Sequence, residues 1–247
     1  MSLDFLRLDA AAHSDRFEPV LRSPMERQAR AAGGRFETRD GWAVAVAYAS
    51  PEQEAQTIMR AAGWSDMSHL GKLEVQAAPK DLETIVPANG PERLELGTAR
   101  RTEGTWWGAL APSRLLVVCE PSRLASMRGQ LEDAIETSGV SASLVEVTTV
   151  FAALTIVGPL AREVFARFCA LDLRPQAAPV GALRPGSVAR QPGIVICEGE
   201  QRFLMLFGWA VGEYVWSQVE EAGRHLGGAP VGVDALASVD ALQEARI

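Results

Sequence analysis

The feature that most constrains the fold is a repeated order of secondary-structure signals along the chain. Each half reads as a strand, a helix opened by a proline, about three strands and a longer amphipathic helix. Pro79 opens the short helix of the first half, and Pro159 opens that of the second. The order repeats while the residue identities do not. This pattern predicts an α+β fold of two related halves, 20–150 and 151–247, that share one core.

The clearest helix signal begins at Ser50. The Ser50 side chain can cap the free N–H groups of a helix, Pro51 fits the first helical position, and Gln53 completes a capping box. An apolar stripe follows at helical spacing, and Gly63 supplies a left-handed residue that would end the helix. A helix is therefore expected between Ser50 and Gly63.

Strand signals come from the alternation of apolar and polar residues. Residues 72–77 alternate, which places apolar side chains on one face of a strand and Lys72, Glu74 and Gln76 on the other. The segments 93–101 and 105–119 also read as strands. The remaining signals are a long helix over 121–138, strands at 152–157, around Val188, at 194–197 and at 203–207, and a helix from about 211 to 226.

Charge and composition exclude several classes of partner. The chain carries 24 Lys and Arg against 31 Asp and Glu, a net charge of −7, and no segment gathers the basic residues, so nucleic acid is not expected to bind. The apolar run from Phe203 to Val211 is far shorter than the roughly 20 residues that span a bilayer. The N-terminus carries no export signal, and three dispersed cysteines read as reduced thiols. These features predict a cytoplasmic protein without membrane contact or disulfides.

Most catalytic motifs are missing from the sequence. It contains no G-x-G-x-x-G dinucleotide motif after a strand, no phosphate-binding P-loop and no G-x-S-x-G nucleophile elbow. His13, His69 and His225 are scattered, and no Cys or His lies at a ligand spacing from another, so no metal site is expected.

Two small constellations favour structural roles. Ser68 and His69 could suggest a nucleophile and its base, but neighbours on a strand point to opposite faces and cannot hydrogen-bond in that way. Cys197 beside Glu198 is typical of a buried thiol next to an exposed carboxylate. Neither pair predicts catalysis.

The first half resembles the aminomethyltransferase (T-protein) family of the glycine cleavage system. The most specific piece is Asp66-Met67-Ser68-His69-Leu70-Gly71-Lys72, which matches an Asp-x-Ser-His-x-Gly-Lys pattern. Further matching pieces are Ser23-Pro24-Met25, Gly33-Gly34-Arg35-Phe36 and Asp40-Gly41-Trp42. In the second half, Val157-Gly158-Pro159 looks like the family's Gly-Pro-led helix start, while Cys169-Ala170-Leu171-Asp172-Leu173-Arg174-Pro175 resembles the gamma subunit of heterotetrameric sarcosine oxidase.

This resemblance implies a fold of two interlocked β-α-β units that hold tetrahydrofolate in a central cavity. Glu200 falls on the family's pterin-gripping glutamate, and a carboxylate suits that task because it accepts two N–H donors from the 2-amino pyrimidinone edge. The segment Ser68, His69 and Leu70 is implied to contact the folate. The likeness extends over most of residues 20–245.

Two departures from the family pattern bear on activity. Where the family carries paired aspartates, this chain reads Arg100-Arg101-Thr102-Glu103-Gly104-Thr105, so Glu103 is the nearest candidate for the catalytic acid. The chain stops at Ile247, and the C-terminal β-barrel domain of full T-proteins is therefore expected to be missing.

Three hypotheses follow from the resemblance. The first is a folate-binding protein of one-carbon, glycine or sarcosine metabolism, weak or inactive as an aminomethyltransferase; if active, it would use tetrahydrofolate and a lipoyl carrier protein. The alternative is a non-catalytic subunit, resembling the sarcosine oxidase gamma subunit, that packs against partner subunits. A folate-binding regulator of iron-sulfur cluster assembly ranks last, because its Lys-Gly-Cys-Tyr-x-Gly-Gln motif is absent. Fold alone does not choose among these activities.

Overall fold

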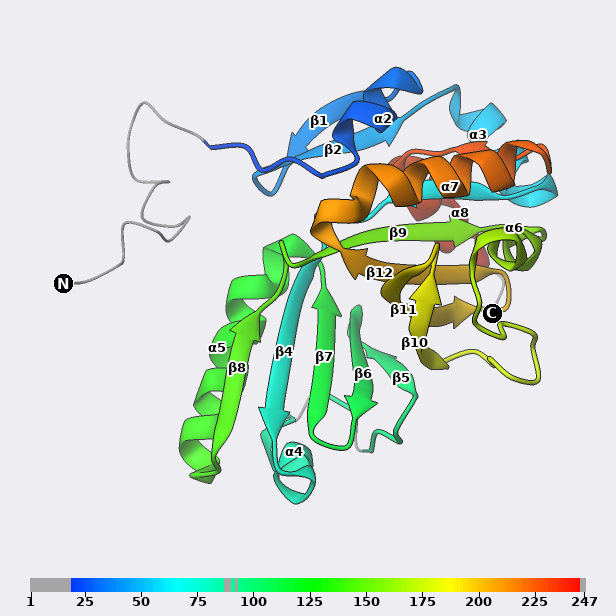
Figure 1. Cartoon of the computed structure of the whole chain (residues 1–247). Helices are drawn as coiled ribbons and strands as arrows, with labels where there is room; N and C mark the ends of the chain where they lie inside the picture. The colour runs from blue at the N-terminus through cyan, green and yellow to red at the C-terminus, as the bar shows by residue number, and fades with distance from the viewer. Residues whose placement is uncertain (1–18, 87–89, 92, 245–247) are drawn as a thin grey trace.

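The computed structural model describes residues 19–86, 90–91 and 93–244. Two sheets pack against each other, and helices cover the outer face of each (Figure 1). A hairpin of β1 (Arg35–Arg39) and β2 (Trp42–Ala47) lies at one end of the molecule together with helix α2 (Glu26–Ala31). No helix of the described residues is long and apolar enough to cross a bilayer.

One sheet has six strands and is built mainly from the second half of the chain. In spatial order its strands are β10 (Leu183–Val188), β11 (Gln191–Gly199), β12 (Arg202–Gly208), β9 (Phe151–Val157), β3 (Gly63–Asp66) and β13 (Ala229–Pro230). Helices α6 (Ala161–Phe168) and α7 (Gly212–Arg224) cover one face, where they bury an apolar cluster that includes Trp216 and Phe203. A short 3-10 helix, Trp209–Val211, leads into α7.

The other sheet has five strands from the first half. In spatial order they are β5 (Ala99–Thr102), β6 (Thr105–Ala111), β7 (Arg114–Cys119), β4 (Gly71–Ala77) and β8 (Ala142–Glu146). Helices α4 (Pro79–Ile85) and α5 (Pro121–Ser138) cover its outer face, where Met127 and Leu131 of α5 are buried. Its inner face packs against the six-stranded sheet through a second apolar cluster.

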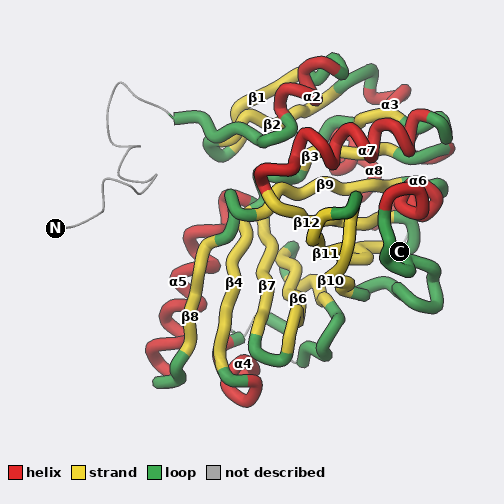
Figure 2. The backbone as a smooth tube through the Cα atoms, viewed as in Figure 1, coloured by secondary structure: helices red, strands yellow, loops and turns green. Residues whose placement is uncertain are grey.

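The two sheets share a strand order, and one strand of the first half belongs to the sheet of the second half. In each sheet three consecutive antiparallel strands are followed by the strand that begins the unit: β5-β6-β7-β4 in one and β10-β11-β12-β9 in the other. The next neighbour differs in origin. β4 pairs with β8 from the same half, whereas β9 pairs with β3 from the first half, with Gly63 opposite Val157 (Figure 2). β3 therefore links the first half of the chain to the sheet of the second.

The expected helix after Ser50 is present as α3 (Pro51–Arg60). Ser50 and Gln53 form the predicted capping box, so this part of the expectation is confirmed. The predicted helix end at Gly63 is wrong, because the helix ends at Arg60 and Gly63 already begins β3. Gly63 is required for close packing: a Cβ there would lie 2.9 Å from Val231.

Two strand predictions need correction. Residues 105–119 form two strands, β6 and β7, because the chain turns at Pro112 and Ser113, and the segment expected from 93 to 101 contributes only β5. The alternation of residues 72–77 is present in β4, and its polar members Lys72 and Glu74 are 0% and 7% exposed. The polar face of β4 is covered because it lies on the inner side of the five-stranded sheet.

The last helix, α8 (Val233–Glu244), lies on the inner face of the six-stranded sheet. Ile58 of α3, Val157 of β9 and Leu236 of α8 belong to one apolar cluster at this end. Glu54 holds the arrangement, because its buried carboxylate accepts hydrogen bonds from the backbone N–H groups of Tyr48 (2.5 Å), Ala49 (2.9 Å) and Gly232 (2.9 Å). A single carboxylate thus fixes α3 against the end of β2 and the start of α8.

Candidate functional site

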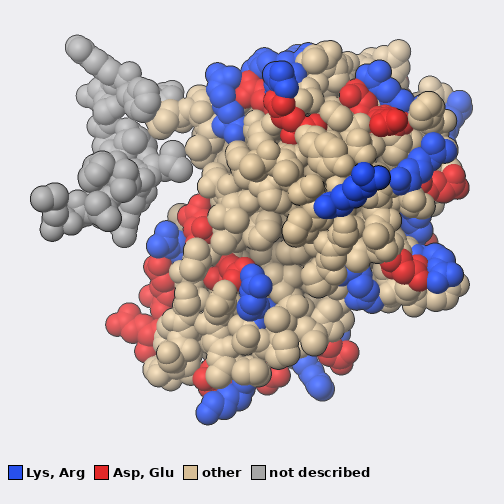
Figure 3. Space-filling view, viewed as in Figure 1, with Lys and Arg blue, Asp and Glu red and all other residues tan. Residues whose placement is uncertain are grey.

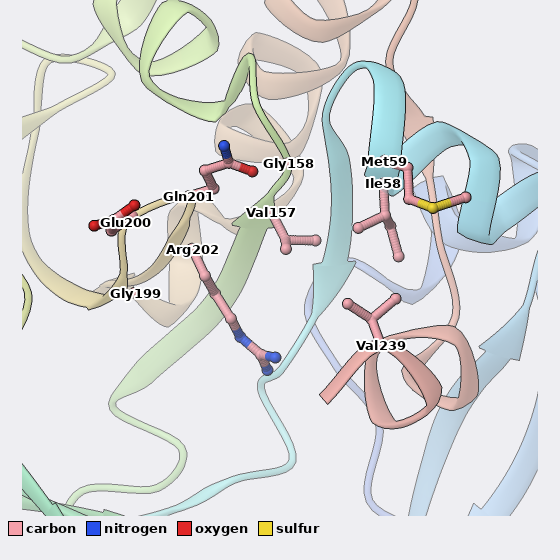
Figure 4. Close-up of a pocket in the computed structure, with 9 residues that line it drawn as sticks. All are labelled: Ile58, Met59, Val157, Gly158, Gly199, Glu200, Gln201, Arg202 and Val239. Carbon is pink, nitrogen blue, oxygen red and sulfur yellow. The ribbon is translucent and has the colours of Figure 1, made fainter. Parts of the chain in front are cut away.

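A pocket of about 480 Å³ lies where α3 and α8 approach the β11–β12 hairpin (Figure 4). One wall is apolar and comes from two helices and a strand. The opposite wall is the hairpin turn with its backbone and polar side chains. The lining residues are Ile58, Met59, Val157 and Val239 on the apolar side, with Gly158, Gly199, Glu200, Gln201 and Arg202 on the other. The pocket can hold a ligand that has an apolar body and a polar edge.

The hairpin beside the pocket contains a β-bulge at Glu198. Cys197 pairs with Phe203 and Gly199 with Arg202, so Glu198 is the extra residue on β11. Bulges redirect a side chain and are frequent next to functional sites. Here the bulge turns a carboxylate toward Arg202, a residue of the pocket wall.

Glu198, Arg202 and Thr155 form a polar group on the inner face of the six-stranded sheet. Arg202 Nε donates to Glu198 Oε2 at 3.0 Å, and Thr155 Oγ1 lies 3.3 Å from the same oxygen and 3.1 Å from the Phe203 carbonyl. The Glu198 side chain is only 12% exposed. The expectation that Glu198 is an exposed carboxylate beside the buried Cys197 is therefore wrong, because the bulge directs it inward.

The five-stranded sheet adds charge near this polar group. Burial raises the pKa of Glu120, which precedes α5, and the neighbouring Arg101 and Arg202 oppose that rise. Because Arg101 lies in β5 and Arg202 in β12, basic residues of both sheets face the same carboxylate. The polar end of the site therefore lies at the junction of the two sheets.

Glu200, the predicted pterin-binding residue, lies in the hairpin turn and is exposed. It lines the pocket at its rim, and Figure 4 shows its carboxylate on the other side of the hairpin from Ile58 and Val239.

Glu103, the predicted catalytic acid, lies in the turn between β5 and β6 with a φ of 46°. Its side chain is 62% exposed and lies 3.6 Å from Arg123. It is not among the residues that line the pocket. Glu103 and Glu200, which the sequence analysis assigned to one site, therefore lie on different hairpins of the structure.

Ser68 and Leu70 belong to the connection that crosses from β3 to β4. The Ser68 hydroxyl accepts a hydrogen bond from the Ala153 N–H at 3.2 Å and lies 3.4 Å from the Ala153 carbonyl, while the Leu70 side chain joins the apolar cluster between the sheets. Asp66 Oδ1 accepts from the Ser68 N–H at 2.9 Å, and burial raises the pKa of the Asp66 carboxyl. These contacts hold the crossing against β9.

Lys72 completes the crossing from inside the protein. Its fully buried Nζ donates to the carbonyls of Leu70 at 2.8 Å, Ser68 at 3.0 Å and Thr148 at 3.4 Å. Burial lowers the pKa of Lys72 to about 7. The Asp-x-Ser-His-x-Gly-Lys segment thus forms internal hydrogen bonds that hold the connection between the two sheets in place.

His69 lies half-buried in a turn of the same crossing. The expectation that Ser68 and His69 are neighbours on a strand is wrong, because β3 already ends at Asp66. Burial, together with the charges of Lys72 and Arg39, lowers the pKa of His69 to about 4, so the imidazole is neutral at physiological pH. The Ser68 hydroxyl hydrogen-bonds to the backbone of Ala153 and the Ser68 N–H donates to the Asp66 carboxylate, so the pair is not arranged as nucleophile and base.

The space between the sheets is lined by apolar side chains. Trp106 and Leu116 of the five-stranded sheet, together with Leu183, Ile196 and Leu204 of the six-stranded sheet, belong to one buried cluster. Within the described part of the chain, no group of three His, Cys, Asp or Glu side chains could hold a metal ion. The polar chemistry near this interface is concentrated at the end that carries Glu198.

Glu198 and Thr155 are functional candidates that the sequence analysis missed. The sequence pattern that could have found them is the alternation of side chains between the two faces of a strand. Ile194, Ile196 and Glu198 alternate along β11, so Glu198 shares a face of that strand with two buried isoleucines. Thr155 likewise shares a face of β9 with Ala153, which belongs to the cluster between the sheets.

Comparison with known proteins identifies the family. The GCVT N-terminal domain family matches residues 25–241. The chain belongs to this family. This GCVT-family chain is 25% identical over 227 residues to an aminomethyltransferase of Saccharopolyspora erythraea, covering 85% of the chain and 60% of the relative. An aminomethyltransferase of Phocaeicola vulgatus is 26% identical over 218 residues, with 83% and 60% covered. The chain thus spans about three fifths of the length of these relatives.

Solved structures confirm the fold of the GCVT-family chain. The aminomethyltransferase T of the Bartonella henselae glycine cleavage system superposes with a TM-score of 0.74 at 17% identity, covering 87% of this chain and 60% of that one. A chain of heterotetrameric sarcosine oxidase from Corynebacterium sp. U-96 gives 0.64 at 19% identity, covering 86% of this chain and 99% of that one. The predicted α+β, T-protein-like fold is confirmed.

Proposed function

We propose that this GCVT-family chain binds a reduced folate in the pocket between α3, α8 and the β11–β12 hairpin. The observation that carries the proposal is the pairing of an apolar wall with a polar hairpin wall in one cavity of about 480 Å³. A pterin ring is flat and carries N–H donors along one edge. Ile58, Val157 and Val239 offer apolar contact to the ring, and the hairpin offers hydrogen-bonding groups to its edge.

We further propose that the chain by itself is a weak or inactive aminomethyltransferase. General acid-base assistance requires a group within hydrogen-bond reach of the reacting nitrogen and contributes about 10²- to 10⁴-fold. Glu103 lies on a different hairpin from the pocket, is mostly exposed and lies near Arg123.

A non-catalytic role beside partner subunits is the second candidate. Two observations favour it. The match to the sarcosine oxidase chain extends over 99% of that chain. The surface over β9 is largely uncharged on the face seen in Figure 3. Val145 of β8 and Val150, just before β9, are 50% and 53% exposed. An uncharged surface with exposed apolar side chains is typical of a protein interface.

Titration calorimetry with tetrahydrofolate under anaerobic conditions tests the first proposal. We expect a Kd in the micromolar range or tighter, about −8 kcal/mol, with a thermal shift of the protein. The absence of heat and of a thermal shift contradicts folate binding and leaves the subunit role. An assay with the lipoyl carrier protein tests turnover: methylenetetrahydrofolate formation at about 1 per second or faster, lost in Glu103→Ala, contradicts the proposed inactivity.

A further inference from the structure

We infer that the free edge of β8 pairs with β8 of a second copy of this chain, so that two five-stranded sheets join into one continuous sheet across a two-fold axis. β8 is the last strand of its sheet and pairs on one side with β4 (Figure 2). Among the described residues, no strand pairs with its other side. The inference goes beyond folate binding and does not depend on it.

β8 lacks the features that protect the other outer strands of the two large sheets. β13 is two residues long and contains Pro230, β10 contains Pro185, and β5 carries the exposed Arg100 and Arg101. Proline, exposed charge and short length all hinder the addition of another strand. β8 has no proline or basic residue, its register with β4 has no bulge, and its single charge, Glu146, lies at its last position. Within the described part of the molecule, β8 is therefore the edge most open to pairing.

The hydrogen bonds to β4 show which backbone groups of β8 face the free side. The Val147 N–H donates to the Lys72 carbonyl at 2.8 Å, and these two residues continue the register of β4 and β8. In an antiparallel ladder, hydrogen-bonded and non-hydrogen-bonded pairs alternate. The backbone groups of Ala142, Leu144 and Glu146 therefore point away from β4, toward the free side.

These groups suit the pairing of β8 with itself. With a two-fold axis beside Leu144, this residue lies opposite Leu144 of the second copy, and Ala142 lies opposite Glu146. Each such pair exchanges two hydrogen bonds. The two Leu144 side chains meet on the face that α5 covers, and Val145, which is 50% exposed, lies opposite Ser143 of the second copy on the other face. Pairing thus satisfies the free backbone groups and covers Val145.

Helix α5 places charged side chains beside this edge. Arg128 Nε lies 2.9 Å from Glu132 Oε1, and Arg128 Nη1 lies 3.9 Å from Glu146 Oε2, so this flank of α5 faces β8. A short connection joins the helix to the strand, and the two run antiparallel. The two strand residues from Glu146 to Leu144 span about 7 Å, which is the rise of between four and five helical residues. Glu132 therefore lies near the level of Leu144 and of the axis.

The charges on the α5 helices of the two copies are complementary. Glu136 follows Glu132 by one more helical turn on the same row of side chains. Across the axis, Arg128 of each copy therefore faces Glu136 of the other, which gives two attractive contacts. Glu132 faces Glu132 of the second copy once, and Arg128 of its own copy already pairs with it. This complementarity favours a second copy of the chain as the occupant of the edge.

Sedimentation equilibrium of the unchanged chain tests the pairing. We expect a dimer with a Kd in the micromolar range, populated at about 100 µM. Val145→Lys should weaken the dimer at least about 10-fold, because a lysine on an edge strand opposes strand addition. Val180→Lys is the matched control, since Val180 is 55% exposed in the loop before β10, and it should change the Kd by less than about twofold. Melting curves of both variants report folding.

Charge exchange on α5 tests the register. Arg128→Glu alone and Glu136→Arg alone should each weaken the dimer by about 10-fold, because each sets like charges against one another twice. An equimolar mixture of these two variants should associate within about threefold of the unchanged chain, because every cross-axis contact is then attractive. Intrachain effects of either substitution do not predict this rescue, because each variant keeps them in the mixture.

Two results would overturn the inference. One is an unchanged chain that stays monomeric up to about 100 µM. The other is a dimer whose Kd responds alike to Val145→Lys and Val180→Lys, since the copies would then associate through another surface. A monomeric chain that binds a different subunit, and loses that binding in Val145→Lys, would assign the edge to that subunit and likewise overturn self-pairing. Calorimetry with tetrahydrofolate is read separately, so failure of folate binding leaves the pairing of β8 standing.

Discussion

The two sheets are built on the same plan and differ in where each obtains its outer strand. β4 is flanked by β8, which follows α5 in the same half of the chain. β9 is flanked by β3, and most of the first half of the chain lies between these two strands in the sequence. The burial of the two flanking strands differs accordingly: all four residues of β3 are buried, whereas Val145 of β8 is 50% exposed. β8, which comes from the same half of the chain as its sheet, lies at the sheet edge, whereas β3, which comes from the other half, is part of the core.

The largest expected effect comes from breaking the distant strand. Trp64→Ala in β3 should lower the free energy of unfolding by about 3–5 kcal/mol, because the indole is fully buried in the core of the other half. Val145→Ala in β8 should lower it by less than about 1 kcal/mol. Urea unfolding of both variants measures the difference. Equal losses would contradict the view that only β3 is integral to the core.

The crossing between the sheets should make stability depend on pH. Because the pKa of Lys72 is lowered from its ordinary value to about 7 in the folded protein, the unfolded chain binds more protons above that pH. Stability from this group therefore rises as pH increases from 7 toward 10, by about 2 kcal/mol between pH 7 and 9. Denaturant titrations of the unchanged protein and Lys72→Met measure it. The variant should lack this rise, and an identical rise in both would contradict the role of Lys72.

The smallest expected effect concerns equivalent turns in the two sheets. The β5–β6 turn places Glu103 and Gly104 in left-handed conformation, while the β10–β11 turn places Ala189 and Arg190 there, with φ of 48° and 61°. Such hairpin turns favour Asn and Gly. Arg190→Gly should therefore stabilise the protein by about 0.5–1 kcal/mol. Thermal melting measures the gain, and a lower melting temperature would mean that the Arg190 side chain outweighs the strain.

Local signals predicted the parts of the fold that depend on neighbouring residues. The helix over 121–138 matches α5 from end to end, because Pro121 marks its start and Gly139 takes the left-handed conformation after its last turn. β3 was missed because a four-residue strand without alternation gains its pairing from β9 far along the chain. Tertiary pairing of this kind leaves no local pattern.

The candidate site was only partly predictable for the same reason. The resemblance indicated the hairpin, since Glu200 lies in it and lines the pocket. The burial of Glu198 depends on the bulge, which is visible only once β11 is paired with β12.

The pairing of β3 with β9 has a consequence for the order in which the protein folds during synthesis. During synthesis all strands of the five-stranded sheet have left the ribosome once residue 146 has emerged, whereas β3 must wait for β9, residues 151–157, and for the strands that enclose it. In that interval the Trp64 side chain has no core to enter. The nascent first half is then the species most in need of protection from aggregation, and a chaperone that binds exposed aromatic residues would find its site there.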